Sequence, residues 1–104
     1  MTTRLLVLWE APTDPAEFER HYRQIHVPLA KALPGLRRYT ISRNGAPIVG
    51  LPYHEVAELD FDDMGSLSAA FDSPEGRATA ADADAITNNL GAQRRAMVFD
   101  VEEV

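Results

Sequence analysis

The sequence predicts an α+β fold in which a four-stranded antiparallel sheet carries helices on one face. Three observations support it: four short segments rich in β-branched and aromatic residues, helical periodicity with capping signals in the segments between them, and Gly or Pro at most of the junctions. The 104 residues, 45% of them hydrophobic, suffice for one core. We therefore expect a single domain spanning residues 1–104.

The first two elements are a strand and a helix. Thr3–Trp9 is a β-rich apolar run. A helix then begins at Pro15, with Asp14 as its N-cap. Its apolar stripe consists of Phe18, Tyr22, Ile25, Leu29 and Leu33. Because Pro28 has no amide hydrogen and crowds the preceding turn, we expect a kink or break near His26 and Val27, and thus two helical pieces.

Two further strands follow the Pro34-Gly35 stop signal. Leu36–Arg43 contains β-branched and aromatic residues and ends at an Asn-Gly turn signal. Tyr53–Phe61 shows alternating apolar and acidic residues in its second half. A loop with two prolines joins these strands.

The last third of the chain predicts more helix and a final strand. Met64–Phe71 has helical spacing, and Ser73-Pro74 restarts a helix that continues through Arg77–Leu90. Gln93–Val101 is the fourth strand. The resulting order, βαββαβ, is that of a ferredoxin-like fold.

Both faces of the predicted sheet are apolar. Leu5, Val7 and Trp9 point to one face, whereas Leu6 and Leu8 point to the other. Since the helices cover only one face, we expect a second copy to cover the other, giving a two-fold homodimer with an enclosed cavity between its sheets.

Composition excludes several classes of function. The absence of cysteine excludes disulfides, thiolate metal sites and a cysteine nucleophile, and it fits a cytoplasmic protein. A net charge of −6 argues against nucleic acid as a partner. No apolar run is long enough to span a membrane, and we expect no membrane partner.

Histidines are the candidates for proton transfer, because their ordinary pKa lies near neutrality. On an α-helical projection His21 and His26 flank opposite edges of the apolar stripe, and His26 adjoins the predicted break. His26 either caps a helix end or turns toward a pocket. Strand alternation places His54 on the face opposite Ala57. If Ala57 packs under the helices, His54 points into the cavity expected between the sheets; the alternative is an imidazole exposed at the strand end.

Other groups complete the candidate site. The aromatic residues Trp9, Tyr22 and Tyr53 could line a pocket, and the Tyr39 hydroxyl could hold a carbonyl group, although such residues are more often core. Asp82 and Asp84 are expected on a solvated face. We expect no metal site, because His21 and His26 are five residues apart whereas metal pairs on helices are three or four apart.

A set of residues in the first 45 positions resembles the EthD family, whose pattern reads F-x-x-H-Y-x-x-x-H-x-P-L followed by P-G-x-x-x-Y. The matching positions are Phe18, His21, Tyr22, His26, Pro28, Leu29, Pro34, Gly35 and Tyr39. The resemblance implies a dimeric α+β barrel and a role in the catabolism of small organic compounds. Within this superfamily the sequence is similar to methylmuconolactone methylisomerase, whose pocket is lined by a histidine at the H-x-P position and by another on a later strand. The similarity implies that His26 lines the pocket by motif and that His54 does so by approximate location.

The expected function is that of a cofactor-free isomerase or lyase, or a monooxygenase-like enzyme, acting on xenobiotic or polyketide-type compounds. His26 would be its general acid/base, with Tyr39 or His54 polarising a carbonyl; no cofactor is expected. The alternative is a non-catalytic dimeric barrel that binds a small apolar ligand or assists an oxygenase. Haem ligation by His26 or His54 stays open, with no motif in its favour.

Overall fold

Four antiparallel strands form one sheet in the order β2-β3-β1-β4 in the computed structural model, which describes all 104 residues. Val7 on the central strand β1 faces Ala57 on β3 and Ala96 on β4. The strands are β1 (Thr3–Trp9), β2 (Arg38–Ile41), β3 (Glu55–Phe61) and β4 (Arg94–Asp100). All four predicted strands are present, and the structure shortens each of the last three.

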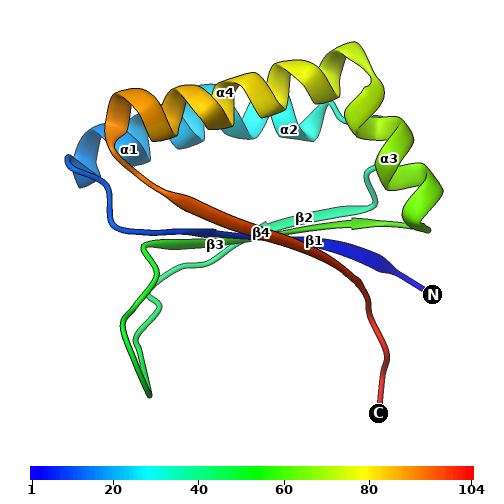
Figure 1. Cartoon of the computed structure of the whole chain (residues 1–104), viewed down its shortest axis with the longest axis horizontal. Helices are drawn as coiled ribbons and strands as arrows, with labels where there is room; N and C mark the ends of the chain where they lie inside the picture. Colours follow the sequence, from blue (N-terminus) through cyan, green and yellow to red (C-terminus); the bar gives the residue numbers. More distant parts are fainter.

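All the helices lie on one side of the sheet (Figure 1). They are α1 (Pro15–His21), η1 (Tyr22–His26), α2 (Val27–Lys31), α3 (Met64–Asp72) and α4 (Pro74–Leu90). The α1-η1-α2 segment and α4 form the helical layer, and α3 turns the chain from β3 into α4. The predicted α+β, ferredoxin-like arrangement is confirmed.

Side-chain caps begin the helices where the sequence places them. Asp14 accepts a hydrogen bond from the amide of Glu17, and Ser73 accepts one from the amide of Gly76. Asp63 caps α3 in the same way. These caps satisfy amides that have no partner within the helix, and so they fix the start of each helix. Gly91, with a φ of +70°, ends α4 in the left-handed conformation.

The first helix has the two α-helical pieces, α1 and α2, that the sequence predicts, but the chain does not leave helical structure between them. Instead, the turn η1 is π-helical, and the amide of Val27 donates to the carbonyl of Tyr22, five residues earlier. A π turn is wider than an α turn and commonly relieves local strain within a helix. Placed directly before Pro28, it lets the helix continue despite the missing amide hydrogen.

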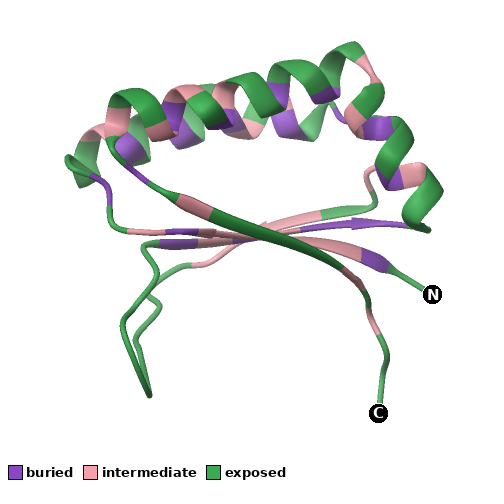
Figure 2. Cartoon of the chain, in the orientation of Figure 1, coloured by how far each residue is buried: buried purple, intermediate pink, exposed green.

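The core lies between the sheet and the helices (Figure 2). The largest fully buried side chains are, in order of decreasing volume, Trp9, Tyr22, Phe18, Phe61, Ile86 and Thr3. The outer face of the sheet also carries apolar side chains: Leu6, Leu8, Val56, Met97 and Phe99. None of these five is fully buried, because no part of the chain covers this face. The two apolar faces predicted from the strands are therefore both present.

Substitution Gly76→Ala is expected to destabilise the protein, because an added Cβ would lie 2.2 Å from the carbonyl oxygen of Ala70. Such overpacking costs about 1–3 kcal/mol. Urea denaturation gives the change in the free energy of unfolding. The matched control is Gly65→Ala in α3, where the nearest atom is 3.5 Å away, and the better helix propensity of alanine should stabilise by up to ~1 kcal/mol. Equal effects of the two substitutions would contradict the packing argument.

Candidate functional site

A small apolar cavity lies between the sheet and the helical layer. Its volume is about 90 Å³, and 11 of its 13 lining residues are hydrophobic. The side chains that bring polar chemistry to it are Trp9, Tyr22, His26, Tyr39 and Thr79. Strands β1, β2 and β3 supply the floor, while η1 and α4 supply the roof. This cavity is formed by one chain and is distinct from the cavity predicted between the sheets of two copies.

His26 is the side chain in this cavity whose ordinary pKa lies near neutrality. It is 7% exposed, and its Nδ1 lies 2.8 Å from Oδ2 of Asp82 on α4. An ionised carboxylate only accepts hydrogen bonds, so Nδ1 carries the hydrogen of the neutral imidazole. Nε2 is then left with a free lone pair. His26 is therefore a pocket histidine and does not serve as a helix cap.

The same carboxylate also holds His21. Nε2 of His21 lies 2.9 Å from Oδ1 and 3.2 Å from Oδ2 of Asp82, so both imidazoles bind the same carboxylate. In an α-helix, residues five apart point in well-separated directions. The π turn η1 brings residues five apart nearly into line. The local distortion before Pro28 thus creates the His21–Asp82–His26 cluster.

Burial sets the protonation state of His26. Desolvation lowers the pKa of His26 below its ordinary value, and the hydrogen bond and charge of Asp82 oppose this only in part. The nearby charges of His21 and Arg94 also lower the pKa of His26. The imidazole is consequently neutral at pH 7, and Nε2 can accept a proton.

Two tyrosines lie next to this histidine. The rings of Tyr22 and His26 are 5.1 Å apart, and the hydroxyl of Tyr22 lies 2.9 Å from that of Tyr39. Burial raises the pKa of both tyrosines, so both hydroxyls keep their hydrogens at neutral pH. One hydroxyl donates to the other, which leaves one O–H free to donate elsewhere.

Trp9 adds a further donor. Its side chain is 1% exposed, and its indole N–H is buried without a hydrogen bond of normal geometry, although it lies near enough to the Tyr22 hydroxyl to act against the rise in the pKa of that group. Arg94, which binds Asp84, lies over the indole ring at 5.8 Å from the centroid. An unpaired buried donor is costly and uncommon. It provides a place where a ligand oxygen could be held.

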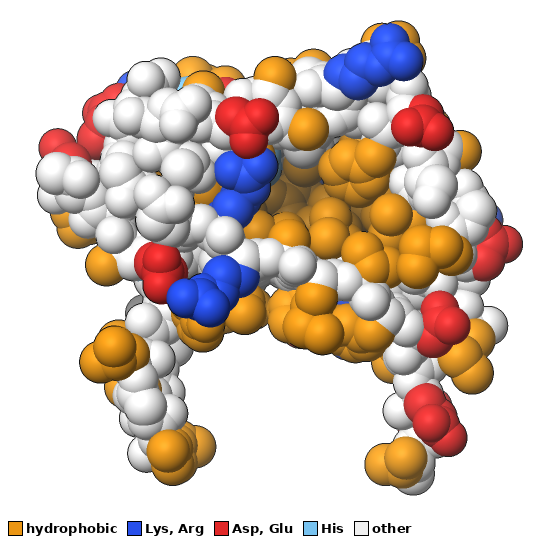
Figure 3. Space-filling model, in the orientation of Figure 1, with side chains coloured by type: hydrophobic (Ala, Val, Ile, Leu, Met, Phe, Trp, Pro, Cys, Tyr) orange, Lys and Arg blue, Asp and Glu red, His pale blue; other side chains and the backbone are white.

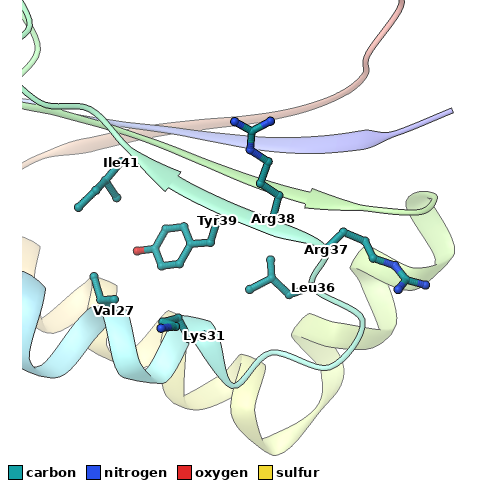
Figure 4. Close-up of a pocket in the computed structure, with 7 residues that line it drawn as sticks. All are labelled: Val27, Lys31, Leu36, Arg37, Arg38, Tyr39 and Ile41. Carbon is teal, nitrogen blue, oxygen red and sulfur yellow. The ribbon is translucent and has the colours of Figure 1, made fainter.

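The cavity adjoins two more open hollows. Toward α3 it shares Leu5 and Phe71 with a hollow of about 530 Å³, and Figure 3 shows an apolar depression between the helical layer and the sheet. At the other side it shares Tyr39 with a groove of about 370 Å³ between α2 and the edge strand β2. In Figure 4 the Tyr39 ring lies between Ile41 and Val27, whereas Arg38 extends to the opposite side of β2. Tyr39 therefore separates the groove from the cavity.

The predicted site residues divide into two groups. Trp9, Tyr22, His26 and Tyr39 line the cavity together. Tyr53 and His54 do not line it; both are exposed and border a different hollow, at the base of the β2–β3 loop. The ring of His54 packs edge-on against Phe18 at 5.0 Å. Alternation along a strand misplaced His54, because β3 begins only at Glu55.

Asp82 is the site residue that the sequence analysis missed, since it was expected on a solvated face. Its side chain is 12% exposed. A signal was present: Asp82 is three residues from Thr79 and four from Ile86, both buried positions of α4. It therefore lies on the buried stripe of that helix. Asp84, in contrast, is exposed as predicted.

Glu55 is a second buried acid near the tyrosines. It is 6% exposed, its Oε1 has no hydrogen-bond partner, and Ser42 donates to its Oε2 at 3.4 Å. Desolvation, and then the charge of Glu19, raise the pKa of Glu55 to about 7. The carboxyl group therefore titrates near neutral pH and, when ionised, raises the pKa of Tyr22 and Tyr39.

Metal binding and membrane spanning were the two other properties considered for the described residues. No group of three or more His, Asp or Glu side chains is arranged to hold a metal ion. None of the helices is both long enough and apolar enough to cross a membrane.

The fold and the cavity define a ferredoxin-like α+β protein with a histidine–carboxylate pair beneath its helices. The sequence also matches a known protein family. The model of the EthD domain matches residues 10–88, which include all the residues of the His21–Asp82–His26 cluster. The chain belongs to the EthD family.

Individual relatives agree with this assignment. An uncharacterized 11.0 kDa protein from the thcB-thcC intergenic region of Rhodococcus erythropolis is 32% identical over 102 residues, which are 96% of this chain and 94% of that protein. The crystal structure of an ethyl tert-butyl ether degradation (EthD) family protein from Bacillus halodurans has a TM-score of 0.85 and 30% identity, covering 98% of this chain and 100% of that one.

A more distant structure shares the fold. SnoaB from Streptomyces nogalater, described as a cofactor-independent oxygenase, has a TM-score of 0.69 and 19% identity, covering 99% of this chain and 95% of the other.

Substitution Asp82→Asn should lower the pKa of His26 further. The carboxylate is the group that raises this pKa against desolvation, through both its hydrogen bond and its charge. An NMR titration of the imidazole ring protons measures the shift. Asp84→Asn on the same helix is the control and should leave the pKa of His26 nearly unchanged. An unchanged or higher pKa in Asp82→Asn would contradict the geometry described above.

Glu55 should make stability decrease as pH rises. The folded protein holds the proton of Glu55 up to about pH 7, whereas the unfolded chain releases it near the ordinary glutamate pKa of 4.5. The stabilisation is thus complete below pH 4.5 and is lost by pH 7, with a change of up to roughly 3 kcal/mol. Urea unfolding of the wild type and of Glu55→Gln at several pH values isolates this effect from that of His26, whose lowered pKa acts in the opposite direction.

The control for Glu55 is Glu58→Gln on the same strand, where the side chain is 41% exposed. It should keep the wild-type pH dependence. If Glu55→Gln also keeps it, the carboxyl of Glu55 is ionised in the folded protein throughout this range.

Proposed function

We propose that this EthD-family protein is an enzyme of small-molecule catabolism that moves a proton on a carbon acid or lactone, with His26 as its general acid/base. The observation that carries the proposal is the buried His26 imidazole, oriented by Asp82 and neutral at pH 7, in an apolar cavity. Moving one proton between two positions of a substrate requires no redox cofactor and no metal.

The proposed step begins at Nε2 of His26. Its lone pair accepts a proton from a carbon next to a carbonyl group, and the electron pair of that C–H bond moves onto the carbonyl oxygen as an enolate. The imidazolium that forms is stabilised by Asp82, which already binds Nδ1–H at 2.8 Å. Where a C=C bond extends the conjugation of the enolate, return of the proton to the far carbon of that system moves the double bond, completes an isomerisation and restores neutral His26.

Donors near His26 would hold the developing oxyanion. The Tyr22–Tyr39 pair has one O–H that is not used between the two hydroxyls, and Trp9 has an unpaired N–H. Such preorganised donors in a water-poor cavity strengthen as negative charge develops on the substrate. We assign the carbonyl to Tyr39 and Trp9 and not to His54, because His54 does not line the cavity.

His21 has a supporting role in this proposal. By binding Oδ1 of Asp82 it fixes the carboxylate, so that Oδ2 faces Nδ1 of His26. Such outer partners orient the imidazole and select its tautomer. His21 acts through Asp82 and is a positioning residue.

The relatives support a reaction of this class. The name of the Bacillus halodurans protein connects the family with ethyl tert-butyl ether degradation, and SnoaB is described as working without a cofactor. The competing function, binding of a small apolar ligand without catalysis, uses the same cavity but needs no base at Nε2.

Replacing His26 by Gln should lower turnover by about 10²–10⁴-fold, the usual contribution of a general base. The assay is hydrogen–deuterium exchange into a panel of small ketones and lactones in D₂O, followed by NMR. Wild-type activity should rise with pH through a single inflection below the ordinary pKa of histidine, because burial lowers the pKa of His26.

His54→Gln is the matched control for this experiment and should retain activity within about threefold. Equal activity of His26→Gln and the wild type would contradict the proposal. Binding of panel compounds without any enzyme-dependent exchange would favour the non-catalytic alternative.

We also propose that the protein works as a homodimer joined through the outer face of the sheet. Leu6, Leu8 and Phe99 form the centre of this face, and Met97 is 55% exposed. Apolar surface of this kind on a sheet is usually covered by another layer. Arg4 and Asp60, which pair on the same face at 2.7 Å, supply both signs of charge, as a self-complementary surface needs.

Substitution Met97→Glu should convert the dimer into monomers, because it places a charge in the proposed interface. Light scattering coupled to size exclusion should give about twice the chain mass of 11.5 kDa for the wild type and a single chain mass for the variant. Met64→Glu, at a similarly exposed methionine on the helical side, should stay dimeric. A monomeric wild type at micromolar concentration would contradict the homodimer.

A further inference from the structure

The segment between β2 and β3, residues 43–54, forms an arm that projects from the sheet on the side away from the helices (Figure 1). Its base is tied to the sheet by backbone hydrogen bonds from Ser42 to Val56 and from His54 to Trp9. Residues 43–53 make no hydrogen bond with the rest of the chain. Nothing in the chain itself therefore supports the arm.

The arm carries large apolar side chains in water. Ile48, Val49 and Leu51 are 98%, 92% and 93% exposed. Loops of soluble proteins are normally built from polar and turn-forming residues. Three unburied aliphatic residues within four positions mark a contact surface.

The total surface of the chain is larger than that of a compact monomer of its mass. A compact monomer of 11.5 kDa exposes about 5,800 Å² by the usual scaling with mass, whereas this chain exposes 6579 Å². The excess, about 800 Å², equals what one partner contributes to a protein–protein interface of standard size. The surface that one chain leaves open is thus enough for one stable interface.

The shape of the molecule favours a second copy of this chain as the partner that covers the arm and the outer face. The arm descends from one end of the sheet and the C-terminal residues 101–104 descend from the other, both on the side of the outer face (Figures 1 and 3). The space between them is bounded by the apolar outer face. If the sheet of a second copy packs on this face in a two-fold arrangement, each copy lies between the two projections of the other.

We propose that residues 43–54 form a clasping arm, which packs Ile48, Val49 and Leu51 against the outer face of a second copy of this chain. The inference rests on the proposed homodimer and adds the segment that holds it together. The arm then contributes a large part of the affinity between the two copies, beyond the contact between their sheets.

The test is the triple variant Ile48→Ser, Val49→Ser, Leu51→Ser. These side chains are more than nine-tenths exposed in the single chain, so the variant should fold, which circular dichroism checks. Sedimentation at graded concentrations should give a dimer dissociation constant raised at least tenfold over wild type. The control Ile25→Ser, Met64→Ser removes exposed apolar side chains from the helical side and should leave the constant unchanged.

A second measurement locates the contact. Because the chain has no cysteine, Val49→Cys carries one photo-crosslinker at a single site. In dimers mixed from isotopically light and heavy chains, crosslinks should join light to heavy chains on strand β4 or β1. If the wild type is a dimer and the triple variant has the same dissociation constant, the clasping arm is overturned and the homodimer stands. Crosslinks that form only within one chain would have the same meaning. A monomeric wild type would overturn the proposed homodimer and the arm together.

Discussion

The site depends on a single carboxylate, that of Asp82, which holds two histidines from the facing helix. The π turn that precedes Pro28 makes this possible, because it aligns His21 and His26 although they are five residues apart. Helix α4 supplies the carboxylate from its buried face, where the other residues are mostly small or apolar. The orientation of His26, its tautomer and the free Nε2 all follow from this one contact.

The sheet gives the molecule two separate apolar regions, and they serve different purposes. The helix-facing side contains the cavity with His26, whereas the outer side carries no helix and is the surface proposed for a second copy. The cavity is consequently complete within one chain. Chemistry and assembly can therefore be tested independently, with variants on opposite faces of the same strands.

Much of this could be predicted from the sequence because it depends on local signals. The caps at Asp14 and Ser73 and the alternation in β1 correctly placed helices and strands. Of the predicted aromatic residues, Trp9, Tyr22 and Tyr39 lie with His26 in one cavity, whereas Tyr53 does not. The remaining features depend on tertiary structure. A helical projection at 100° per residue cannot show a π turn, so the partnership of Asp82 was missed. The early start predicted for β3 likewise misplaced His54.

The tautomer of His26 tests the central claim most directly. Long-range ¹H–¹⁵N correlation NMR of the ¹⁵N-labelled protein at pH 7 reports which ring nitrogen carries hydrogen. A neutral ring with hydrogen on Nδ1 and an unprotonated Nε2 is the predicted result. Hydrogen on Nε2 alone, or a doubly protonated ring, would show that Asp82 does not orient His26 as a base.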